Sequence, residues 1–352
     1  MARKLLIVES PAKAKTIGKY LANEFRVLAS FGHVRDLPKK NGSIDVNNDF
    51  TPKYQLIAKN QKHVEEILAA AKNCDAIYLA SDQDREGEAI AWHLEEILRE
   101  HNLLAGREVS RVTFNEITKP AILDAVLHPR QIDGNLVAAQ QARLTLDYLI
   151  GFNVSPLLWR KIKPGLSAGR VQSPALRLIC EREDEIRKFV PEDYFGIHLF
   201  SHKGRTKFKA RIVQHAGNKL ETKSISTEQY AQDIVASLAQ YPEAKIVKVS
   251  KKQKKKNPTA PFITSSLQIE SSRQLGFATD RTMRIAQSLY EGVELNHESV
   301  GLITYMRTDS VQLSSLAINT TKNEIESEYG KQYSKVRHFS TKSKGAQEAH
   351  EA

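Results

Sequence analysis

Two apolar runs early in the chain are each followed by a helical pattern. Residues 5–8 form a short apolar run that ends at Glu9, and Pro11 stands at the first turn of a helix predicted to continue through Leu21. Residues 76–80 have the pattern of a buried strand and lead into an acidic loop. The helix predicted after this loop carries its apolar side chains on one face, at Ile90, Leu94, Ile97 and Leu98.

This alternation of strands and helices predicts a mostly parallel sheet with helices on both sides. In such sheets, ligands bind at the carboxyl ends of the strands. Glu9 follows the first predicted strand and Asp82 follows the later one. We therefore expect their side chains to lie at the same edge of the sheet.

The pattern changes after about residue 135. Residues 140–150 and 173–187 read as helices, and the segment between them, KIKPGLSAGRVQSP, contains glycine and proline. Residues 190–250 break into strand-like pieces such as YFGIHLF and KIVKVS. These pieces predict a β-rich region.

A lysine-rich run, KKQKKKNP at 251–258, precedes the last helical region. We interpret it as a solvated connector rather than an element that reads a nucleic-acid sequence, because runs of like charge are usually solvated. Residues 265–275 and 279–290 then predict two helices joined by a turn at Gly276, a helix-turn-helix-like arrangement. The chain is thus expected to be multidomain, with α/β and α+β parts.

Length and composition agree with several soluble domains. A chain of 352 residues is long enough for two or three cores, and its 41% hydrophobic and 26% charged residues are typical of globular proteins. No stretch approaches the roughly 18 consecutive apolar residues of a membrane span. The opening MARKLLIVES lacks the features of a signal peptide. We expect a cytoplasmic protein with no membrane partner.

Charge narrows the class of partner. Lysine and arginine outnumber aspartate and glutamate by 52 to 41, a formal net charge of +11. General solubility is one explanation, but this balance favours a polyanionic partner, because phosphate contacts release counterions. The only cysteines, Cys74 and Cys180, are far apart and lack a partner at metal-binding spacing, which argues against a disulfide scaffold or a zinc site.

The most informative local motif is SDQDREGEA at 81–89. Asp82, Asp84 and Glu86 place three carboxylates within five residues, where their repulsion calls for a counter-ion. Carboxylate oxygens suit Mg²⁺. The alternative is a solvated acidic turn that caps the following helix.

Glu9 and Lys13 strengthen the interpretation as a reactive site. At the sheet edge, Glu9 can lie beside the Asp82 loop and either bind metal or donate a proton, although a single strand-end glutamate is usually an ordinary surface residue. Lys13 follows one helical turn later and can offer its ammonium to a phosphate.

Two of these segments together resemble a known module. IVESPAKAKTIGKYL and SDQDREGEAIAWHL are similar to the Toprim domain, which topoisomerases share with bacterial primases and some nucleases. A third segment distinguishes among these classes, because GLITYMRTDS at 301–310 resembles the active-site segment of the bacterial DNA topoisomerase I family, of type IA. A lone tyrosine in an apolar stretch would otherwise be assigned to the core.

The resemblance implies a role for each residue of the reactive site. Tyr305 would attack a DNA phosphodiester and form a 5′-phosphotyrosyl link, so the strand can be resealed without ATP. Arg307 and Lys13 would stabilise the phosphate, and Glu9 would act as general acid and then base at the 3′-oxygen. Asp82, Asp84 and Glu86, with Glu9, would hold Mg²⁺.

The resemblance also implies DNA contacts elsewhere. FGHVRDLP at 31–38 is similar to the family segment whose histidine, here His33, lies near DNA; a lone histidine would otherwise be structural or solvent-facing. The helical region implies further contacts, namely Arg143, Asp147, Tyr148, Arg160, Ser167, Ala168, Gly169, Arg170, Val171 and Gln172. Arginines suit phosphates and an aromatic ring suits stacking, although Tyr148 could equally pack in the core.

The closing residues AQEAHEA resemble the start of a family motif whose histidine would be His350, another DNA contact, and we expect a truncated, amino-terminal portion of the family chain. The expected divisions are a Toprim domain at 1–134, a partial helical single-strand-binding domain at 135–189, a partial β-rich arch segment at 190–260 and a truncated helical domain with the tyrosine at 261–352.

The expected function is ATP-independent relaxation of negatively supercoiled DNA by a monomer that acts on a single-stranded region. One alternative is a truncated fragment that binds DNA without turnover. A primase or nuclease built on the Toprim module is another, and neither of these would form a tyrosine adduct.

Overall fold

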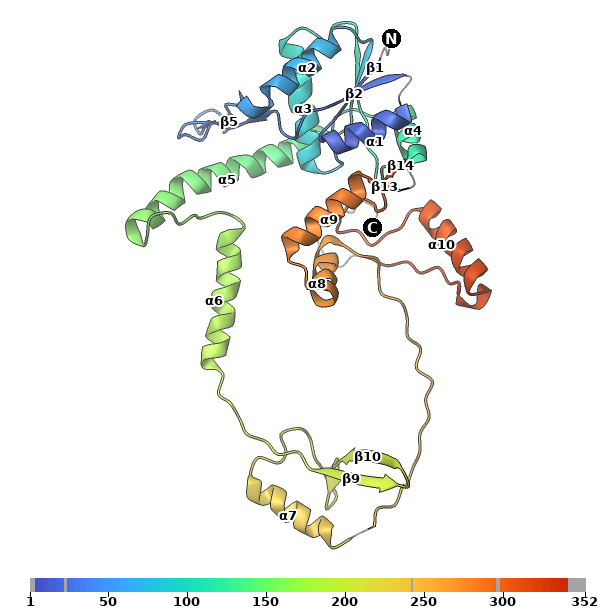
Figure 1. Ribbon diagram of the computed structural model, residues 1–352. Helices are drawn as coiled ribbons and strands as arrows, with labels where there is room; N and C mark the ends of the chain where they lie inside the picture. The colour runs from blue at the N-terminus through green and yellow to red at the C-terminus, as the bar shows by residue number, and fades with distance from the viewer. Residues whose placement is uncertain (1–3, 22–23, 242, 296–297, 341–352) are drawn as a thin grey trace. The chain divides into compact units, whose positions relative to one another are not determined.

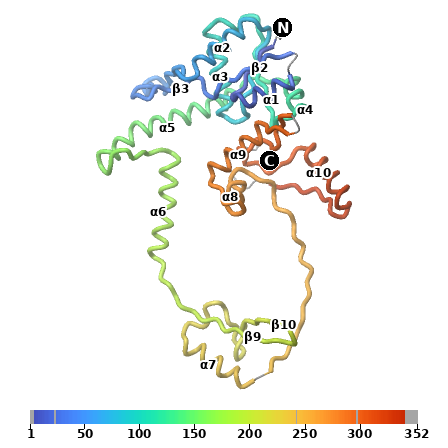
Figure 2. The backbone as a smooth tube through the Cα atoms, viewed as in Figure 1, coloured from blue at the N-terminus to red at the C-terminus, as the bar shows by residue number. Residues whose placement is uncertain are grey.

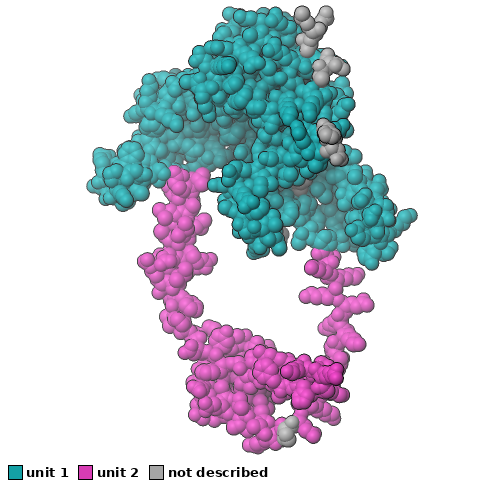
Figure 3. Space-filling model, viewed as in Figure 1, with its two compact units in different colours: residues 1–170, 258–352 teal, residues 171–257 magenta. Residues whose placement is uncertain are grey.

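The computed structural model describes residues 4–21, 24–241, 243–295 and 298–340. By its contacts the chain divides into two compact units (Figure 3). Unit 1 combines residues 1–170 with residues 258–352, and unit 2 comprises residues 171–257. Segments far apart in sequence therefore build unit 1 together.

The centre of unit 1 is a four-stranded parallel sheet (Figure 1). Its strands are β1 (Lys4–Val8), β2 (Phe25–Ala29), β7 (Ala76–Leu79) and β8 (Glu108–Arg111). They are ordered β2-β1-β7-β8, and β1 pairs with both β2 and β7. This confirms the predicted parallel sheet and brings the ends of β1 and β7 side by side.

Helices cover both faces of this sheet, as predicted. Leu5 and Ile7 point to one face, where they pack with residues of α2 (Gln61–Ala71) and α3 (Arg85–Glu100). Leu6 and Val8 point to the other, where they pack with residues of α1 (Pro11–Leu21), α4 (Lys119–Leu127) and α9 (Thr279–Glu291). Successive residues of a strand face opposite ways, so one apolar run supplies two cores.

Short elements connect the sheet to its helices. They are β3 (Arg35–Asp36), β4 (Ile44–Asp45), β5 (Thr51–Pro52), β6 (Gln55–Leu56) and the 3₁₀ turn η1 (Ala58–Asn60). β3 pairs with β6 and β4 pairs with β5, both antiparallel.

The predicted helical region contains α5 (Gly134–Lys161) and α6 (Gln172–Lys188). The carboxylate of Asp133 caps α5 by accepting from two backbone amides, and α5 packs on α3. The Gly- and Pro-bearing segment between α5 and α6 interrupts the helices as expected, and the division into units falls within it. No helix in the described part of the chain is long and apolar enough to cross a membrane.

Unit 2 holds the hairpin of β9 (His198–Lys203) and β10 (Thr206–Arg211), the short strands β11 (Gln214–His215) and β12 (Asn218–Lys219), and α7 (Glu228–Ala239). The expected β-rich region is thus mixed. α7 was not predicted, although Thr227 caps it and Ala231 and Ile234 bury its apolar side.

Two strand expectations need correction. KIVKVS at 245–250 is not a strand, and its residues are exposed along a path without helix or strand (Figure 2). Alternating apolar residues form a stable strand only where another strand supplies hydrogen-bond partners, and no such pairing occurs for this segment in the described structure. In YFGIHLF, the strand begins only at His198.

The last part of unit 1 contains the predicted helix-turn-helix-like pair. α8 (Thr264–Leu275) ends at Gly276, whose φ of 65° is the left-handed conformation that glycine adopts easily, and α9 follows. The remaining elements are β13 (Val293–Leu295), β14 (Glu298–Val300), α10 (Ser315–Glu328) and the 3₁₀ turn η2 (Lys331–Tyr333).

A buried ion pair ties the end of the sheet to α3. Arg111 and Glu88 are both fully buried, and the guanidinium Nε lies 3.0 Å from Glu88 Oε2. Arg130 donates to the same carboxylate at 2.8 Å. Arg111 also donates to the backbone carbonyl of Asp82 at 2.6 Å, so the pair braces the acidic loop.

We predict that Glu88→Ala lowers the free energy of unfolding of unit 1 by about 3–5 kcal/mol, because it leaves the Arg111 charge buried without a carboxylate. Both tryptophans, Trp92 and Trp159, lie in unit 1, so urea denaturation followed by tryptophan fluorescence reports on this unit. The matched control is Glu96→Ala on the same helix, whose exposed ion pair with Arg99 is worth less than about 1 kcal/mol. Equal losses in the two variants would contradict the prediction.

Candidate active site

The acidic loop between β7 and α3 is folded tightly against the start of α3. The Asp84 carboxylate caps this helix, accepting from the backbone amide of Gly87 at 2.8 Å, and Ser81 Oγ donates to the Gly87 carbonyl at 2.6 Å. Asp84 thus caps the helix, as the alternative expected. Neither aspartate belongs to a solvated turn, because Asp82 is 6% exposed and Asp84 8%.

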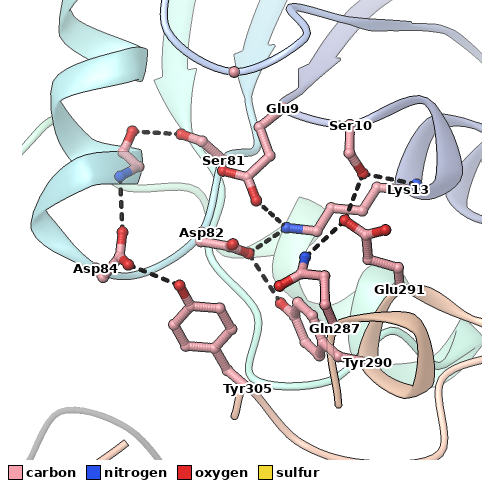
Figure 4. A network of polar contacts seen from close by, with 12 residues as sticks. Glu9, Ser10, Lys13, Ser81, Asp82, Asp84, Gln287, Tyr290, Glu291 and Tyr305 are labelled. Carbon is pink, nitrogen blue, oxygen red and sulfur yellow. Dashed lines mark hydrogen bonds and ion pairs between the residues drawn. The ribbon is translucent and has the colours of Figure 1, made fainter. Parts of the chain in front are cut away.

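Lys13 joins the ends of the two strands. Its side chain is fully buried on α1, and its ammonium donates both to Glu9 Oε1 and to Asp82 Oδ1 (Figure 4). The expectation that Glu9 lies beside the Asp82 loop is met through this shared cation. The position of the ammonium was not predicted, because the contact with Asp82 depends on how the strands are ordered in the sheet.

Burial and charge shift the pKa values of all three groups. Burial, together with the neighbouring Glu9, raises the pKa of Asp82 to about 7. Burial alone would raise the pKa of Glu9, but its contacts with Asp82 and Lys13 hold the pKa below its usual value. Burial likewise opposes the charge on Lys13, yet the two carboxylates raise the pKa of its ammonium.

Tyr305 lies against the acidic loop, 221 positions from Asp84 in sequence. Its hydroxyl donates to Asp84 Oδ2 at 2.7 Å (Figure 4). Its backbone amide donates to the Asn115 carbonyl at 2.9 Å. The residue is only 2% exposed, and burial with the nearby Asp82 and Asp84 charges raises the pKa of the phenol. The guanidinium of Arg307 is 3.7 Å from Asp84 Oδ2 and mostly exposed.

Contacts between α1 and the region around α9 hold the tyrosine segment against the sheet. Glu291 Oε1 accepts from Ser10 Oγ at 2.8 Å and from Gln287 Nε2 at 2.7 Å. Thr16 Oγ1 lies 2.9 Å from Ser299 Oγ. The ring of Tyr290 packs edge-on against the ring of Tyr305, with centroids 5.3 Å apart.

Glu9, the acidic loop and Tyr305 open onto one cavity of about 660 Å³. Its lining combines four carboxylates of the acidic site with an imidazole, a phenol and two guanidinium groups, namely Glu9, Asp82, Asp84, Glu86, His33, Tyr305, Arg284 and Arg307. The cavity therefore offers acids, a nucleophile and cations to one ligand.

The loop carrying His33 is held in an unusual conformation. Phe31 and Gly32 both have positive φ values, 60° and 85°. Asn60 Nδ2 donates to the carbonyls of Phe31 and His33, at 3.2 and 2.7 Å. His33 Nε2 thereby reaches to within 3.3 Å of Glu86 Oε2, and contacts with His33 and Gln140 lower the pKa of Glu86 against the effect of burial.

The donor types in this cavity suit Mg²⁺, since the carboxylates of Glu9, Asp82, Asp84 and Glu86, with Glu291 also in the lining, are hard oxygen ligands. A nearby divalent cation would offset the cost of burying the Asp82 charge, which is the cause of its raised pKa. As they are placed, no three of the described His, Cys, Asp and Glu side chains already form a metal-binding group, because Lys13, Tyr305 and His33 contact the carboxylates instead.

The structure places most of the remaining predicted DNA contacts along α5 and just after it. Arg143 is half-buried near Glu86, and Asp147 Oδ1 lies 2.7 Å from the guanidinium of Arg170. Tyr148 stacks on Phe152 and its hydroxyl accepts from the Ser43 amide, so the ring has partners within the protein.

The rest of the predicted set is divided between the two units. Arg160 and Ser167 are exposed, Ala168 and Gly169 are more buried, and the Ala168 amide donates to Ser155 Oγ at 3.1 Å. Val171 and Gln172 are exposed and belong to unit 2. His350 lies outside the described residues.

Several residues of the site were not predicted from the sequence. Tyr290 donates to Asp82 Oδ1 at 3.3 Å, Glu291 binds Ser10, and Arg111 braces the Asp82 backbone. Tyr290 and Glu291 stand at the end of a helix with an ordinary amphipathic pattern. Arg111 gave no clear signal, because it ends a short strand of mostly polar sequence, EVSR, that begins exposed.

Comparison with known protein families finds a match for each of two parts of the chain. The Toprim domain family matches residues 4–117, which include the sheet, Glu9 and the acidic loop. The DNA topoisomerase family matches residues 131–352, which include Tyr305.

The individual proteins that the chain resembles are also DNA topoisomerases. The chain is 53% identical to DNA topoisomerase 1 of Xylella fastidiosa strain 9a5c over 357 residues, covering 100% of this chain and 44% of the relative. It is 53% identical to DNA topoisomerase 1 of Rickettsia felis over 353 residues, covering 99% of this chain and 45% of the relative. The structure of full-length topoisomerase I from Thermotoga maritima is similar, with a TM-score of 0.79 and 42% identity, covering 94% of this chain and 53% of that one.

The chain belongs to the bacterial DNA topoisomerase I family, a family of type IA isomerases. The predicted resemblance and fold class are confirmed. The chain spans less than half the length of these curated relatives.

We predict that Gly87→Ala distorts the candidate active site without unfolding the sheet, so that DNA cleavage, where this site performs it, slows about a hundredfold. A Cβ at this position would lie 2.1 Å from the Asp82 carbonyl oxygen, so the acidic loop has to shift. A displacement of about 1 Å in a reacting group can cost roughly a hundredfold in rate. Gly18→Ala on α1 is the matched control, because its Cβ would meet only an ordinary contact at 3.9 Å. Single-turnover cleavage of a labelled oligonucleotide measures both; a Gly87→Ala rate within a few-fold of the control would refute the prediction.

Proposed function

We propose that this chain carries the strand-cleaving site of a type IA DNA topoisomerase, and that Tyr305 is its nucleophile. The observation that carries the proposal is the 2.7 Å hydrogen bond from the Tyr305 hydroxyl to Asp84, in a cavity shared with Glu9 and Arg307. A phenol needs to lose its proton to attack phosphorus, and Asp84 is within hydrogen-bonding reach of that proton.

The raised pKa of Tyr305 makes the free phenol a poor nucleophile. Arg307 would compensate for this when a DNA phosphate is bound in the cavity. Arg307 is free to turn toward the phosphate, because its guanidinium is mostly exposed. Positive charge at the phosphate then stabilises the negative charge that develops on oxygen during attack. The Tyr305 Oη–P bond forms as the P–O3′ bond breaks, leaving the 5′-phosphate on the tyrosine.

Glu9 is proposed to protonate the departing 3′-oxygen and to remove that proton again during resealing. In the structure, Lys13 and Asp82 keep the pKa of Glu9 low. A bound phosphate adds negative charge beside Glu9 and competes for the Lys13 ammonium, and both effects raise the pKa of Glu9 toward the range a proton donor needs.

Asp82 and Asp84, with Glu86 and Glu9 in the same cavity, are the residues proposed to hold Mg²⁺. Bound there, the ion would supply positive charge to the phosphate and help align the 3′-hydroxyl for rejoining.

The substrate proposed for this site is a single-stranded region of negatively supercoiled DNA, bound by a monomer. The net charge of +11 supports a polyanionic partner. We further propose His33, Arg143, Asp147, Tyr148, Arg160 and the segment 167–172 as DNA contacts. We also propose that the chain contains four domains, at residues 1–134, 135–189, 190–260 and 261–352.

We predict that Tyr305→Phe abolishes the covalent protein–DNA adduct, because phenylalanine has no oxygen to form the ester. The measurement is denaturing electrophoresis of protein mixed with a single-stranded oligonucleotide labelled at its 3′ end, with and without Mg²⁺. The matched control is Tyr290→Phe, which removes the hydroxyl of a second buried tyrosine whose ring centre lies 5.3 Å from that of Tyr305. This variant is expected to keep adduct formation within about tenfold of the unsubstituted chain. An adduct that persists in Tyr305→Phe rules out the assignment.

Relaxation of negatively supercoiled plasmid by the same chain distinguishes full turnover from the alternative, a fragment that binds DNA without turnover. Relaxation that depends on Tyr305 supports the enzyme. Binding without either adduct or relaxation supports the alternative.

A further inference from the structure

The β9–β10 hairpin of unit 2 has two chemically different faces. Residues directly opposite each other in an antiparallel pair share a face, and the register pairs His198 with Arg211 and Phe200 with Lys209. One face therefore combines three cations, two imidazoles and one phenyl ring, namely Lys207, Lys209, Arg211, His198, His202 and Phe200. We call these six residues the basic face.

The hairpin is anchored beyond its strands, on the side of the opposite face, where Leu199 and Phe208 remain 48% and 43% exposed. Ile197 and Ile212 continue that face just beyond the strands, joined by a backbone hydrogen bond of 3.1 Å. Both pack against a small core that includes Ile225 and the α7 residue Ile234. The basic face is consequently turned away from the core of its own unit.

The charge on this part of the chain is of one sign. Residues 198–220 contain no aspartate or glutamate, while their basic residues are Lys203, Arg205, Lys207, Lys209, Arg211 and Lys219. The three cations of the basic face are exposed along β10. Alternate residues of a strand stand roughly 7 Å apart, so they form an extended row suited to successive phosphates.

Phe200 provides a feature that lysines alone lack. Its side chain is 74% exposed in the middle of this row, and the Lys209 ammonium lies 5.3 Å from the centre of its ring. A single exposed ring is common on protein surfaces, so the feature that points to a ligand is the row of cations beside this one. Unpaired bases stack on such rings while neighbouring cations bind the backbone, whereas a duplex keeps its bases stacked inside.

We propose that the basic face binds a segment of single-stranded nucleic acid, with a base stacked on Phe200 and the phosphates held by Lys207, Lys209 and Arg211. This binding does not rest on cleavage at Tyr305. It would give unit 2 a strand-holding surface of its own.

The test uses the full chain carrying Tyr305→Phe, so that no covalent adduct interferes, and an oligothymidylate in which one base is 5-iodouracil. Ultraviolet cross-linking followed by peptide mapping is expected to identify Phe200. Phe200→Ala should remove that cross-link, and Phe200→Trp should restore a cross-link at position 200. Because the side chain is mostly exposed, these variants should keep the circular dichroism of the parent chain. Mapping that finds no cross-link in residues 198–211 overturns the proposal.

A second measurement tests the cations. Replacing Lys207, Lys209 and Arg211 together by glutamine should flatten the plot of log affinity against log salt by about 2, since each lost phosphate contact contributes roughly 0.7. The matched control replaces Lys251, Lys252 and Lys254 of the connector, which removes the same charge. Equal effects would mean that only net charge matters and would overturn the proposal. So would binding to phosphatidylserine vesicles that depends on the basic face while oligonucleotide binding does not.

The two proposals fail separately. A Tyr305 adduct that forms normally in the chain that retains Tyr305, with no cross-link at Phe200 in the Tyr305→Phe chain, would retain the cleavage proposal and reject this one. A cross-link at Phe200 in the Tyr305→Phe chain, with no adduct in the chain that retains Tyr305, would do the reverse.

Discussion

The buried ammonium of Lys13 is the interaction on which the candidate active site depends. It lies between Glu9 and Asp82, which follow neighbouring parallel strands, so one cation offsets the repulsion of two carboxylates that burial has brought together. Without it, both strand ends would carry uncompensated buried charge, which costs several kcal/mol. In the proposed function, the same cation would also serve a bound phosphate.

A second buried cation supports the first. Arg111 pairs with Glu88 on α3 and also binds the backbone of Asp82. Lys13 therefore holds the acidic loop through the side chain of Asp82, and Arg111 holds it through the backbone carbonyl of Asp82. Asp84 is then left to face Tyr305, and this division of contacts explains how three acidic groups within five residues serve different neighbours.

Local sequence patterns account for most of the elements and for the choice of the candidate reactive groups. The strands at 4–8 and 76–79, the helices around them and the turn at Gly276 all follow apolar periodicity and backbone preference. Strand–helix alternation is enough to predict that Glu9 and Asp82 share a sheet edge. Where pairing or packing decides, the patterns fail: 245–250 alternates like a strand but has no strand partner in the described structure, and α7 is a helix in a region expected to be β-rich.

The sequence by itself determined the family of the chain, because its carboxylates, a lysine and a tyrosine stand in recognisable motifs. Only the tertiary structure decided which of them touch. The Tyr305–Asp84 hydrogen bond spans 221 positions, and the contacts of Glu291 with Ser10 span 281. Such pairs arise from packing between distant segments, and the periodicity of one segment does not specify which other segment it contacts. For that reason the hydrogen-bond partner of Tyr305 could not be predicted from the sequence.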